Sequence, residues 1–332
     1  MTIRISGTGS ALPEKILTNH DLEQMVETSD EWIRERTGIR ERHIADGDTV
    51  ASLAADACSK ALADAGKRAE DVDLIIAATC SNEMLLPCAG CRIQSLIGAH
   101  RATAFDLNAA CAGFLFALQT AQAYIASGIY RNALIVGAEV LSGIVDWSDR
   151  STCVLFGDGA GAVFVEECNE VGRGILSLCQ GSDGSRGNVL YCRERPVAAG
   201  KSAGGTTGEP DPFESTDTFV HMNGAEVYKF AVRQVPECID EVLEIAGLSA
   251  GEIDHFVLHQ ANLRIIEAIA KRLGIAPERF PVNLDRVGNT SSAAIPILLD
   301  ELNKCGKIKP GDRLVLSGFG AGLTYGACAL RW

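Results

Sequence analysis

One cysteine stands among small residues directly before a predicted helix, a setting in which a thiol can act as a nucleophile. The segment Asp106-Leu-Asn-Ala-Ala-Cys111-Ala-Gly-Phe runs into a helical pattern that closes at Gly128. Backbone N–H groups at a helix start stabilise a thiolate and can lower a cysteine pKa to roughly 3.5–7.5, while small neighbours leave room for an acyl group. A buried structural cysteine is the competing interpretation, and this motif alone does not decide between the two.

A histidine and an asparagine in the last third of the chain could act on the same substrate. His259 ends the apolar run 255–259, and α/β proteins place their sites at the carboxyl ends of strands. Asn289 stands beside a glycine and just before a predicted helix, where an N-cap is the commoner role. The glycine-rich turn 317–326 can aim backbone N–H groups inward, as an oxyanion hole requires.

Apolar runs of strand length alternate with stretches of helical periodicity. The strand-length runs lie at 73–79, 133–138, 162–165, 255–259, 313–317 and 327–330. The helical stretches lie at 50–65, 113–127, 225–246 and 263–273. This alternation predicts an α/β protein whose sheets are covered on both faces.

The chain also resembles itself at an offset of 181 residues. Residues 62–73 align without a gap on residues 243–254, and each copy reads as a helix closed by glycine, a turn and an apolar strand. A general likeness of helix–turn–strand units is the alternative, but we interpret the repeat as a duplication with halves at 1–170 and 171–332. The position that matches His259 is Ala78, so the fold itself does not require a histidine.

The composition limits the classes of function. The chain has 332 residues, of which 47% are hydrophobic and 22% charged, and this predicts a sizeable buried core. A formal net charge of −13 is unlike the broad basic surface of a nucleic-acid binder, so no nucleic-acid partner is expected. No stretch approaches the ~20 apolar residues of a membrane span, and no signal sequence opens the chain. We therefore expect a cytoplasmic protein without membrane contact.

Two cysteine and glycine patterns suggest other functions, but weakly. Most of the twelve cysteines stand singly in apolar runs, which suits reduced thiols better than disulfides. Cys88 and Cys91 have the spacing of a redox or zinc pair, but no second pair follows at metal spacing, so no metal is expected. The segment Gly7-Thr-Gly9 begins like a dinucleotide fingerprint and lacks its third glycine.

Six motifs occur in an order that one known family shares. They are Thr28-Ser-Asp-Glu-Trp32-Ile-Arg-Glu-Arg36-Thr-Gly-Ile-Arg40, Asn108-Ala-Ala-Cys111-Ala-Gly-Phe, Phe156-Gly-Asp-Gly-Ala-Gly161, His259-Gln-Ala-Asn-Leu-Arg264, Gly288-Asn289-Thr-Ser and Gly318-Phe-Gly-Ala-Gly322. With them the chain resembles β-ketoacyl-acyl carrier protein synthase III, of the thiolase superfamily, over nearly its whole length. The resemblance implies a five-layered αβαβα fold built from two duplicated halves, a homodimer, and the first condensation of fatty-acid synthesis.

The resemblance also implies the role of each reacting residue. Cys111 would take a short acyl group from acyl-CoA, whose carbonyl oxygen would be held by the N–H groups of Cys111 and Ala321. Loss of CO₂ from malonyl-acyl carrier protein would then create an enolate, to which His259 and Asn289 would donate hydrogen bonds. The product would be a 3-oxoacyl-acyl carrier protein, and no cofactor is expected beyond these substrates.

Binding residues follow from the same resemblance. The predicted coenzyme A contacts are Thr28, Trp32, Arg36, Arg150, Gly224 and Asn262. The predicted acyl carrier protein contacts are Gln260, Ala261, Asn262, Leu263, Arg264, Lys229, Lys271 and Arg272. The predicted acyl pocket contains Leu86 and Phe156. An ordinary half-buried tryptophan and a solvated helix face are the competing interpretations of the first two sets.

Three features depart from the family pattern and leave primer length and branching open. Ala321 stands where many relatives have glycine, and Leu86 stands where the best-known relatives have a phenylalanine that reaches across the dimer. A Gly-, Pro- and Thr-rich surface insertion at about 191–218 is longer than in typical relatives. A secondary-metabolite acyltransferase, or a quinolone- or polyketide-type starter synthase, would keep the same three residues. A catalytically silent carrier-binding or thiol-redox protein is the alternative from another class.

Overall fold

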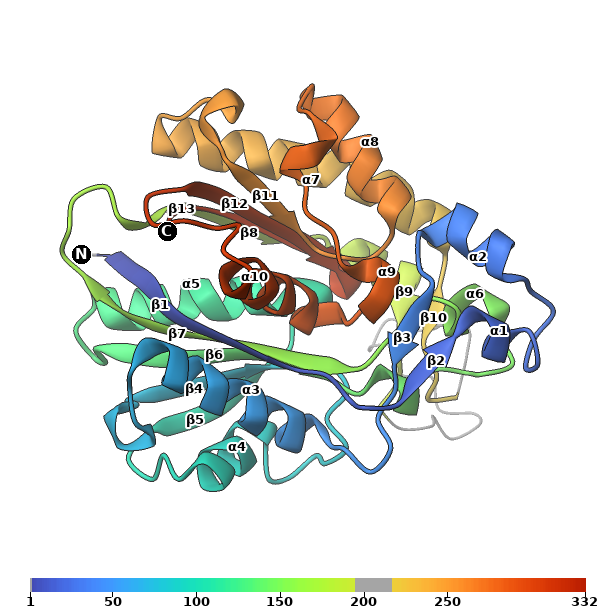
Figure 1. Cartoon of the computed structure of the whole chain (residues 1–332), viewed down its shortest axis with the longest axis horizontal. Helices are drawn as coiled ribbons and strands as arrows, with labels where there is room; N and C mark the ends of the chain where they lie inside the picture. The colour runs from blue at the N-terminus through green and yellow to red at the C-terminus, as the bar shows by residue number, and fades with distance from the viewer. Residues whose placement is uncertain (1, 195–216) are drawn as a thin grey trace, which may run out of the picture.

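Two sheets and three layers of helices stack in the order αβαβα (Figure 1). The computed structural model describes residues 2–194 and 217–332, so most of the predicted insertion at 191–218 lies outside the described residues. The five-layered α/β fold predicted from the resemblance is confirmed. Each predicted strand and helix is present, with ends that differ by a few residues.

The first sheet has five strands in the order β1-β7-β6-β4-β5. These strands are β1 (Thr2–Ala11), β4 (Leu74–Ala78), β5 (Thr103–Leu107), β6 (Asn132–Glu139) and β7 (Gly159–Cys168). β4 pairs in parallel with β5 and β6, whereas β7 runs antiparallel to β1 and β6. Helices α3 (Val50–Ala65) and α4 (Ala89–Ile97) cover its outer face (Figure 1).

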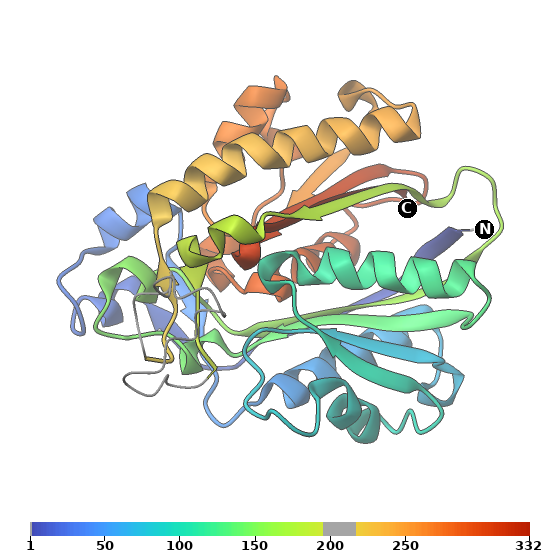
Figure 2. The ribbon, with the colours of Figure 1, turned by 180° about the vertical axis from the view of Figure 1, so that it is seen from behind.

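The second sheet has four strands in the order β11-β12-β13-β8. They are β8 (Gly174–Ser182), β11 (His255–Leu258), β12 (Arg313–Gly320) and β13 (Thr324–Arg331). Helices α7 (Gly224–Ala246) and α8 (Leu263–Leu273) cover the outer face of this sheet. Helices α5 (Gly113–Ala126) and α10 (Ala294–Lys304) lie between the two sheets, as Figure 2 shows for α5 from behind.

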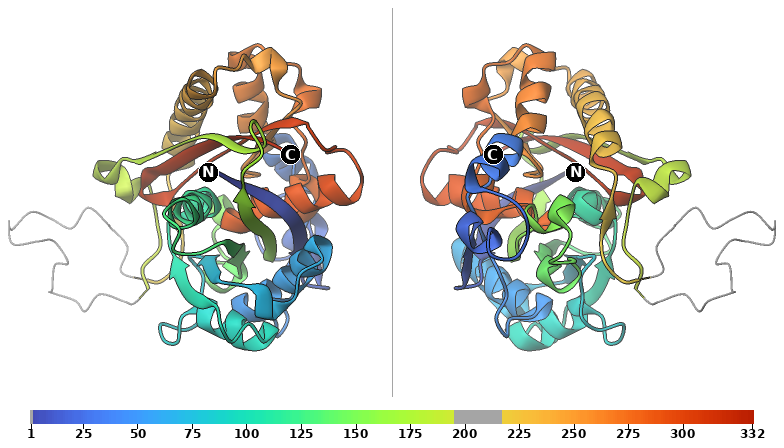
Figure 3. Two further views of the ribbon diagram at one scale, coloured as in Figure 1. Left: turned by 90° about the vertical axis from the view of Figure 1, so that its left-hand side faces the viewer. Right: turned by 90° about the vertical axis from the view of Figure 1, so that its right-hand side faces the viewer.

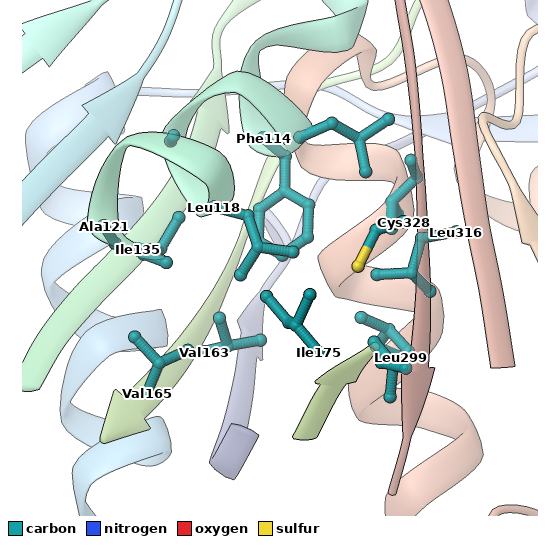
Figure 4. Close-up of a cluster of buried hydrophobic side chains, with 14 of the residues drawn as sticks. Phe114, Leu118, Ala121, Ile135, Val163, Val165, Ile175, Leu299, Leu316 and Cys328 are labelled. Carbon is teal, nitrogen blue, oxygen red and sulfur yellow. The ribbon is translucent and has the colours of Figure 1, made fainter. Parts of the chain in front are cut away.

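The middle layer forms the central hydrophobic core (Figure 4). Phe114 and Leu118 of α5 and Leu299 of α10 are buried against Val163 of β7 and Leu316 of β12. Each of these side chains is removed from water by both halves at once, and burying one such side chain contributes about 1.5–3 kcal/mol. The core therefore couples the two sheets and holds the segments that precede α5 and α10 in fixed positions.

The sequence repeat recurs in the structure at the same offset. β4 and β11 start at residues 74 and 255, β6 and β12 at 132 and 313, and α5 and α10 at 113 and 294. The glycines that end α3 and α7, Gly66 and Gly247, have φ angles of 64° and 65°. The second sheet lacks a counterpart of β5, because the matching residues form the short helix α9 (Leu284–Val287). The division at residue 170 remains a prediction.

Shorter elements gather at one end of the molecule, which faces the viewer in the right-hand panel of Figure 3. They are β2 (Ile16–Thr18), α1 (Asn19–Leu22), α2 (Asp30–Thr37), β3 (Glu41–His43), α6 (Arg150–Cys153), β9 (Leu190–Tyr191) and β10 (His221–Met222). A separate hydrophobic cluster, which includes Leu22, Ile33 and Val154, holds this end together. Among them, β9 and β10 carry residues that line the site described below.

Gly7 and Gly9 belong to β1 and have a packing role. A Cβ atom at Gly7 would lie 2.3 Å from the Ala61 carbonyl oxygen, and one at Gly9 would lie 2.3 Å from that of Ala57. The glycines thus let α3 approach the sheet closely. This packing role accounts for both glycines without a dinucleotide-binding function. Among the helices of residues 2–194 and 217–332, none combines the length and apolar character that crossing a membrane requires.

Candidate active site

Cys111 lies in a short 3₁₀ turn, Ala110–Ala112, between β5 and the start of α5. Its side chain is buried, with 9% of the residue exposed. The preceding residue Ala110 has φ 46°, a left-handed conformation that is unfavourable for a residue with a Cβ atom. Such backbone strain is typical of functional sites, and here it directs the thiol into a cavity between the two halves.

His259 and Asn289 come from the second half. The His259 amide donates to the Ser317 carbonyl oxygen at 2.8 Å, which extends the parallel pairing of β11 with β12 by one step. The Asn289 backbone is held by Leu155 and Gly157 through hydrogen bonds of 2.9 and 3.0 Å. Its side-chain oxygen accepts from the Ser291 amide at 2.9 Å, so the NH₂ group is the part available to a ligand.

One cavity brings the three predicted catalytic side chains together. Cys111, His259 and Asn289 line it, and its volume is about 120 Å³. Its other walls are mostly apolar, with Phe156, Leu190, Met222, Val227, Ile265 and Phe319. A mostly apolar cavity with a few converging polar groups is the usual form of a small-molecule site.

The thiol and the imidazole are both uncharged in this cavity at neutral pH. Burial raises the pKa of Cys111 to about 12, although hydrogen bonds from Ser291 and from its own amide act in the opposite direction. Burial lowers the pKa of His259 to about 3. The helix start would lower the pKa of Cys111, but desolvation at this fully buried sulfur acts in the opposite direction and is the larger effect.

The glycine-rich turn after β12 lies directly against the nucleophile. A Cβ atom at Gly320 would lie 2.5 Å from the Cys111 amide nitrogen and 3.0 Å from the Ala110 Cβ, so only glycine fits there. Ala321 follows it and lines a second cavity beside Cys111, and Gly322 takes φ 100°. The turn thus places Ala321, one of the two residues whose amides are the predicted oxyanion donors, in the lining of a cavity that Cys111 also lines.

The second cavity, of about 510 Å³, also reaches Cys111 and is lined by residues of both halves. Phe156 lines both cavities, and Leu141, Ile144 and Cys80 line the second. Leu86, the other predicted pocket residue, is 78% exposed on a surface loop and lines neither cavity of its own chain.

The predicted coenzyme A residues fall into two connected groups. Gly224 and Asn262 line the catalytic cavity. Trp32 lies outside it near two guanidinium groups, with Arg150 at 4.9 Å and Arg36 at 5.9 Å from its ring centre. The Asn262 side chain donates to the Arg36 carbonyl oxygen at 3.0 Å and so joins the groups. Thr28, the sixth residue, has a buried hydroxyl to which no described group hydrogen-bonds.

The predicted carrier-protein residues are mostly exposed along α7 and α8, with one exception. Arg264, Lys271, Arg272 and Lys229 are exposed, and Ala261, Asn262 and Leu263 are partly exposed. Gln260 must be removed from this set. Its side chain is fully buried, donates to the Leu258 carbonyl oxygen at 2.8 Å and accepts from the Asn283 amide at 3.2 Å. It supports the turn after β11 and cannot reach a partner.

The Cys88–Cys91 pair opens α4 on the surface of the first half. Cys88 is the N-cap of that helix, and both thiols are free. A hydrogen bond with Cys88 raises the pKa of Cys91, so this thiol is a poor nucleophile at neutral pH. Within the described residues, no group of three or more His, Cys, Asp or Glu side chains could hold a metal ion.

The sequence interpretation missed three residues around the nucleophile. Ser291 hydrogen-bonds the Cys111 thiol, Cys80 lies within 3.8 Å of the Ser291 hydroxyl, and Glu139 contacts Cys80. Ser291 could have been found from the internal repeat, because Ser291 matches Ala110 at the offset of 181 residues. Both residues have positive φ angles, 46° and 50°.

Two similar halves, with a cysteine before the central helix of one and a histidine and an asparagine from the other, define a thiolase-fold condensing enzyme. Family models described as 3-oxoacyl-[acyl-carrier-protein (ACP)] synthase III, and as its C-terminal part, match residues 105–184 and 243–332. The chain belongs to the β-ketoacyl-[acyl-carrier-protein] synthase III family.

Full-length relatives support this assignment. The chain is 50% identical to the β-ketoacyl-[acyl-carrier-protein] synthase III of Symbiobacterium thermophilum, over 99% of this chain and 98% of the relative. It is 47% identical to that of Clostridium acetobutylicum, over 100% and 99%. The crystal structure of 3-oxoacyl-[acyl-carrier-protein] synthase III from Aquifex aeolicus superposes with a TM-score of 0.91 at 43% identity, covering 99% of this chain and all of the other.

Proposed function

We propose that this enzyme condenses a short acyl-CoA primer with malonyl-acyl carrier protein and so begins fatty-acid synthesis. The observation that carries the proposal is the single cavity lined by Cys111, His259 and Asn289, which come from the two halves of the chain. The names of its full-length relatives support the same reaction.

In the first half-reaction the Cys111 sulfur attacks the thioester carbonyl of acyl-CoA. The bond to the coenzyme A sulfur breaks, and the proton of the Cys111 thiol leaves with coenzyme A as its thiol. The negative charge that develops on the carbonyl oxygen is stabilised by the amides of Cys111 and Ala321. One such donor typically contributes ~2.7–4 kcal/mol to the transition state.

In the second half-reaction a malonyl thioester replaces coenzyme A in the cavity. Loss of CO₂ leaves an enolate, and the neutral His259 imidazole and the Asn289 NH₂ group each donate a hydrogen bond to its oxygen. The carbanion then attacks the acyl carbonyl on Cys111, the bond from that carbonyl to the sulfur breaks, and the sulfur leaves as a thiolate that takes a proton from water to restore the thiol. A neutral imidazole suits this role, because it donates without first having to gain a proton.

Substrate binding is assigned to the two surfaces beside the cavity. The Trp32 ring, with Arg150 and Arg36, offers an aromatic face and two positive charges for the adenine and phosphates of coenzyme A. Arg264 at the start of α8, with Lys229, Lys271 and Arg272, offers positive charge to an acidic carrier protein. The chain's net charge of −13 makes this local patch the favourable docking surface.

A two-substrate assay tests the function. Acetyl-CoA and malonyl-acyl carrier protein should give acetoacetyl-acyl carrier protein, and a series of acyl-CoA lengths and branches should identify the preferred primer. Trp32→Ala should raise the KM for acyl-CoA by about tenfold, and Arg264→Glu should raise the KM for the malonyl carrier by a similar factor. Product formation from malonyl-CoA alone, without a carrier requirement, would favour a secondary-metabolite acyltransferase.

We infer that the working unit is a homodimer formed along β5. This strand is an edge of the first sheet, and such an edge offers unpaired backbone groups. Beside it, the surface residues Met84, Leu85, Leu86 and Leu96 expose 40–78% of their surface. In such a dimer Leu86 could reach the second cavity of the partner. Free thiols throughout the chain suit a reducing compartment, and we place the enzyme in the cytoplasm.

Sedimentation measures the oligomeric state. The wild-type protein should sediment as a dimer, and Leu85→Asp with Leu86→Asp should shift it toward the monomer because two charges would be buried in the interface. Val171→Asp, an equally drastic change at a fully exposed apolar residue, should leave the dimer intact. A wild-type monomer at micromolar concentration would contradict the inference.

A further inference from the structure

Glu139 is a fully buried carboxylate at the end of β6, behind the catalytic cysteine. One carboxylate oxygen accepts from the Ser81 hydroxyl at 2.5 Å, the Cys80 amide at 3.1 Å and the Thr79 hydroxyl at 3.2 Å. The Cys80 thiol lies 3.5 Å from both oxygens. None of these partners is a cation, so an isolated acidic group is kept in the core by hydroxyl, thiol and amide donors alone. Burying such a group is costly unless it is fully hydrogen-bonded.

The other carboxylate oxygen reaches into the second half. It accepts from the Ser292 hydroxyl at 2.7 Å, and the same hydroxyl lies 2.8 Å from the Ala78 carbonyl oxygen. The turn that carries Ser292 also rests on β6, since a Cβ atom at Gly137 would lie 2.2 Å from the Ser292 carbonyl oxygen. Glu139 therefore links the end of β4 to the turn between Asn289 and α10.

The duplication explains why this link exists. At the offset of 181 residues, Ser292 matches Cys111, Ala78 matches His259, and Glu139 matches Gly320. The contact of Ser292 with Ala78 and Glu139 is thus the counterpart of the catalytic centre in the other half. Where Gly320 leaves space beside the Cys111 amide, Glu139 fills the matching space with a carboxylate.

The contact of Ser292 with Ala78 and Glu139 is connected to the catalytic site through Ser291. The Ser291 residue has φ 50°, its amide donates to the Asn289 side chain at 2.9 Å, and its hydroxyl hydrogen-bonds the Cys111 thiol and lies 3.8 Å from the Cys80 sulfur. A strained turn of this kind persists only where its surroundings hold it in place. Glu139 is the residue that holds both flanks, through Cys80 and Ser292.

We propose that Glu139 is a positioning residue for the condensation, which holds the Asn289–Ser292 turn so that the Ser291 hydroxyl stays on the Cys111 sulfur and the Asn289 amide faces the cavity. The predicted effect on the condensation rests on the proposed function, whereas the predicted effect on the reactivity of the Cys111 thiol does not. Beyond burial, the hydrogen bond from Ser291 lowers the pKa of Cys111 and the Glu139 carboxylate raises it. The two residues therefore act on the thiol in opposite directions.

Two conservative variants distinguish a role in positioning the catalytic groups from a role in the stability of the fold alone. Glu139→Gln keeps the shape and removes the charge, and Ser292→Ala removes the link to the second half. Both should slow malonyl decarboxylation by about tenfold, as expected for a small misplacement of a catalytic group. Ser292→Ala should also move the pH profile of Cys111 alkylation by iodoacetamide to higher pH, as should Ser291→Ala, because each weakens or removes the Ser291 hydrogen bond while the Glu139 carboxylate stays.

Iodoacetamide needs neither coenzyme A nor malonyl groups, so this readout stands even if the condensation is assigned wrongly. Glu166→Gln, a change of the same kind on the neighbouring strand β7, should leave the alkylation profile and both rates at wild-type values. The proposal is overturned if the folded Glu139→Gln and Ser292→Ala proteins keep wild-type decarboxylation and alkylation profiles. Rates that fall only as far as thermal stability falls, with an unmoved alkylation profile, would also overturn it. Should Glu139→Gln fail to fold, the loss of one hydroxyl in Ser292→Ala decides the question.

Discussion

Replacing Cys111 with serine should abolish acyl transfer to the protein and lower the rate of condensation by at least about 10³-fold. The serine hydroxyl is a far weaker nucleophile than a thiol, and in this buried site nothing among the described residues compensates. The Cys111 thiol is already held neutral by burial, with a pKa of about 12. Its reactivity thus depends on sulfur chemistry and on the oxyanion donors. Mass spectrometry after mixing with acetyl-CoA should find one acetyl group on the wild-type protein, on the peptide with Cys111.

The matched control is Cys88→Ser, which changes a free thiol at the start of α4 and not in the catalytic cavity. This variant should be acetylated and should condense at the wild-type rate, which also tests the thiol-redox alternative. An acetyl group found on another cysteine, or full activity of Cys111→Ser, would refute the assignment of the nucleophile.

The catalytic residues could be chosen from sequence because each sits in a local setting with a physical meaning. Cys111 precedes a helix among small residues, and His259 ends a strand whose counterpart in the first half carries Ala78 instead. Because Ala78 occupies the matching position, the fold does not require a histidine there, and His259 is therefore a candidate for function. The family resemblance then supplied the roles, and the structure brings the side chains to one cavity.

The ionisation of Cys111 could not be predicted in the same way, because it depends on burial by distant segments. The helix start acts locally and was visible in the sequence, but desolvation comes from packing between the halves and outweighs it. The prediction that Gln260 contacts the carrier protein was wrong for a related reason. Its position inside a matched motif suggested an exposed contact, whereas the turn after β11 directs the side chain inward to Leu258 and Asn283.

Three strands of the two main sheets were not anticipated, and each lacks the apolar run that marks a fully buried strand. β1 contains Gly7 and Gly9, which serve the close approach of α3. β5 is an edge strand whose residues are mostly partly exposed, and β8, at the edge of the second sheet, mixes buried with partly exposed residues and ends in exposed ones. Strands with a continuous apolar run, the edge strand β11 included, were therefore predictable from hydrophobicity, whereas these three depended on pairing that only the tertiary structure provides.

The duplication gives these results a common physical explanation. Both halves place a strained residue, Ala110 or Ser291, directly before a central helix, and the two turns meet at the interface of the halves. In one turn the following residue is the nucleophile, and in the other it is Ser292, hydrogen-bonded to Glu139. The fold thus supplies two equivalent positions, of which one is open to substrate and the other is filled by a polar network.

Substituting His259 or Asn289 by alanine should separate the two half-reactions. Each variant should still accept an acetyl group on Cys111 at a rate within about tenfold of wild type, because the oxyanion donors for that step are backbone amides. Decarboxylation of the malonyl thioester should fall by about 10²–10³-fold in each variant, the usual loss for one donor to a developing oxyanion. Burial lowers the pKa of His259 to about 3, so the wild-type decarboxylation rate should show no titration of this imidazole between pH 5 and 8.

The double variant tests whether the two groups act on the same oxygen. If His259 and Asn289 donate to one enolate oxygen, removing both should cost less than the product of the single losses, because the first loss already leaves the charge poorly stabilised. His255→Ala, which changes a partly exposed histidine on the same strand β11, should leave both half-reactions unchanged. Equal loss of acylation and decarboxylation in the single variants would contradict the division of roles. A pH dependence centred near the ordinary histidine pKa would instead require a charged imidazole, and the enolate would then be stabilised by an ion pair rather than by two neutral donors.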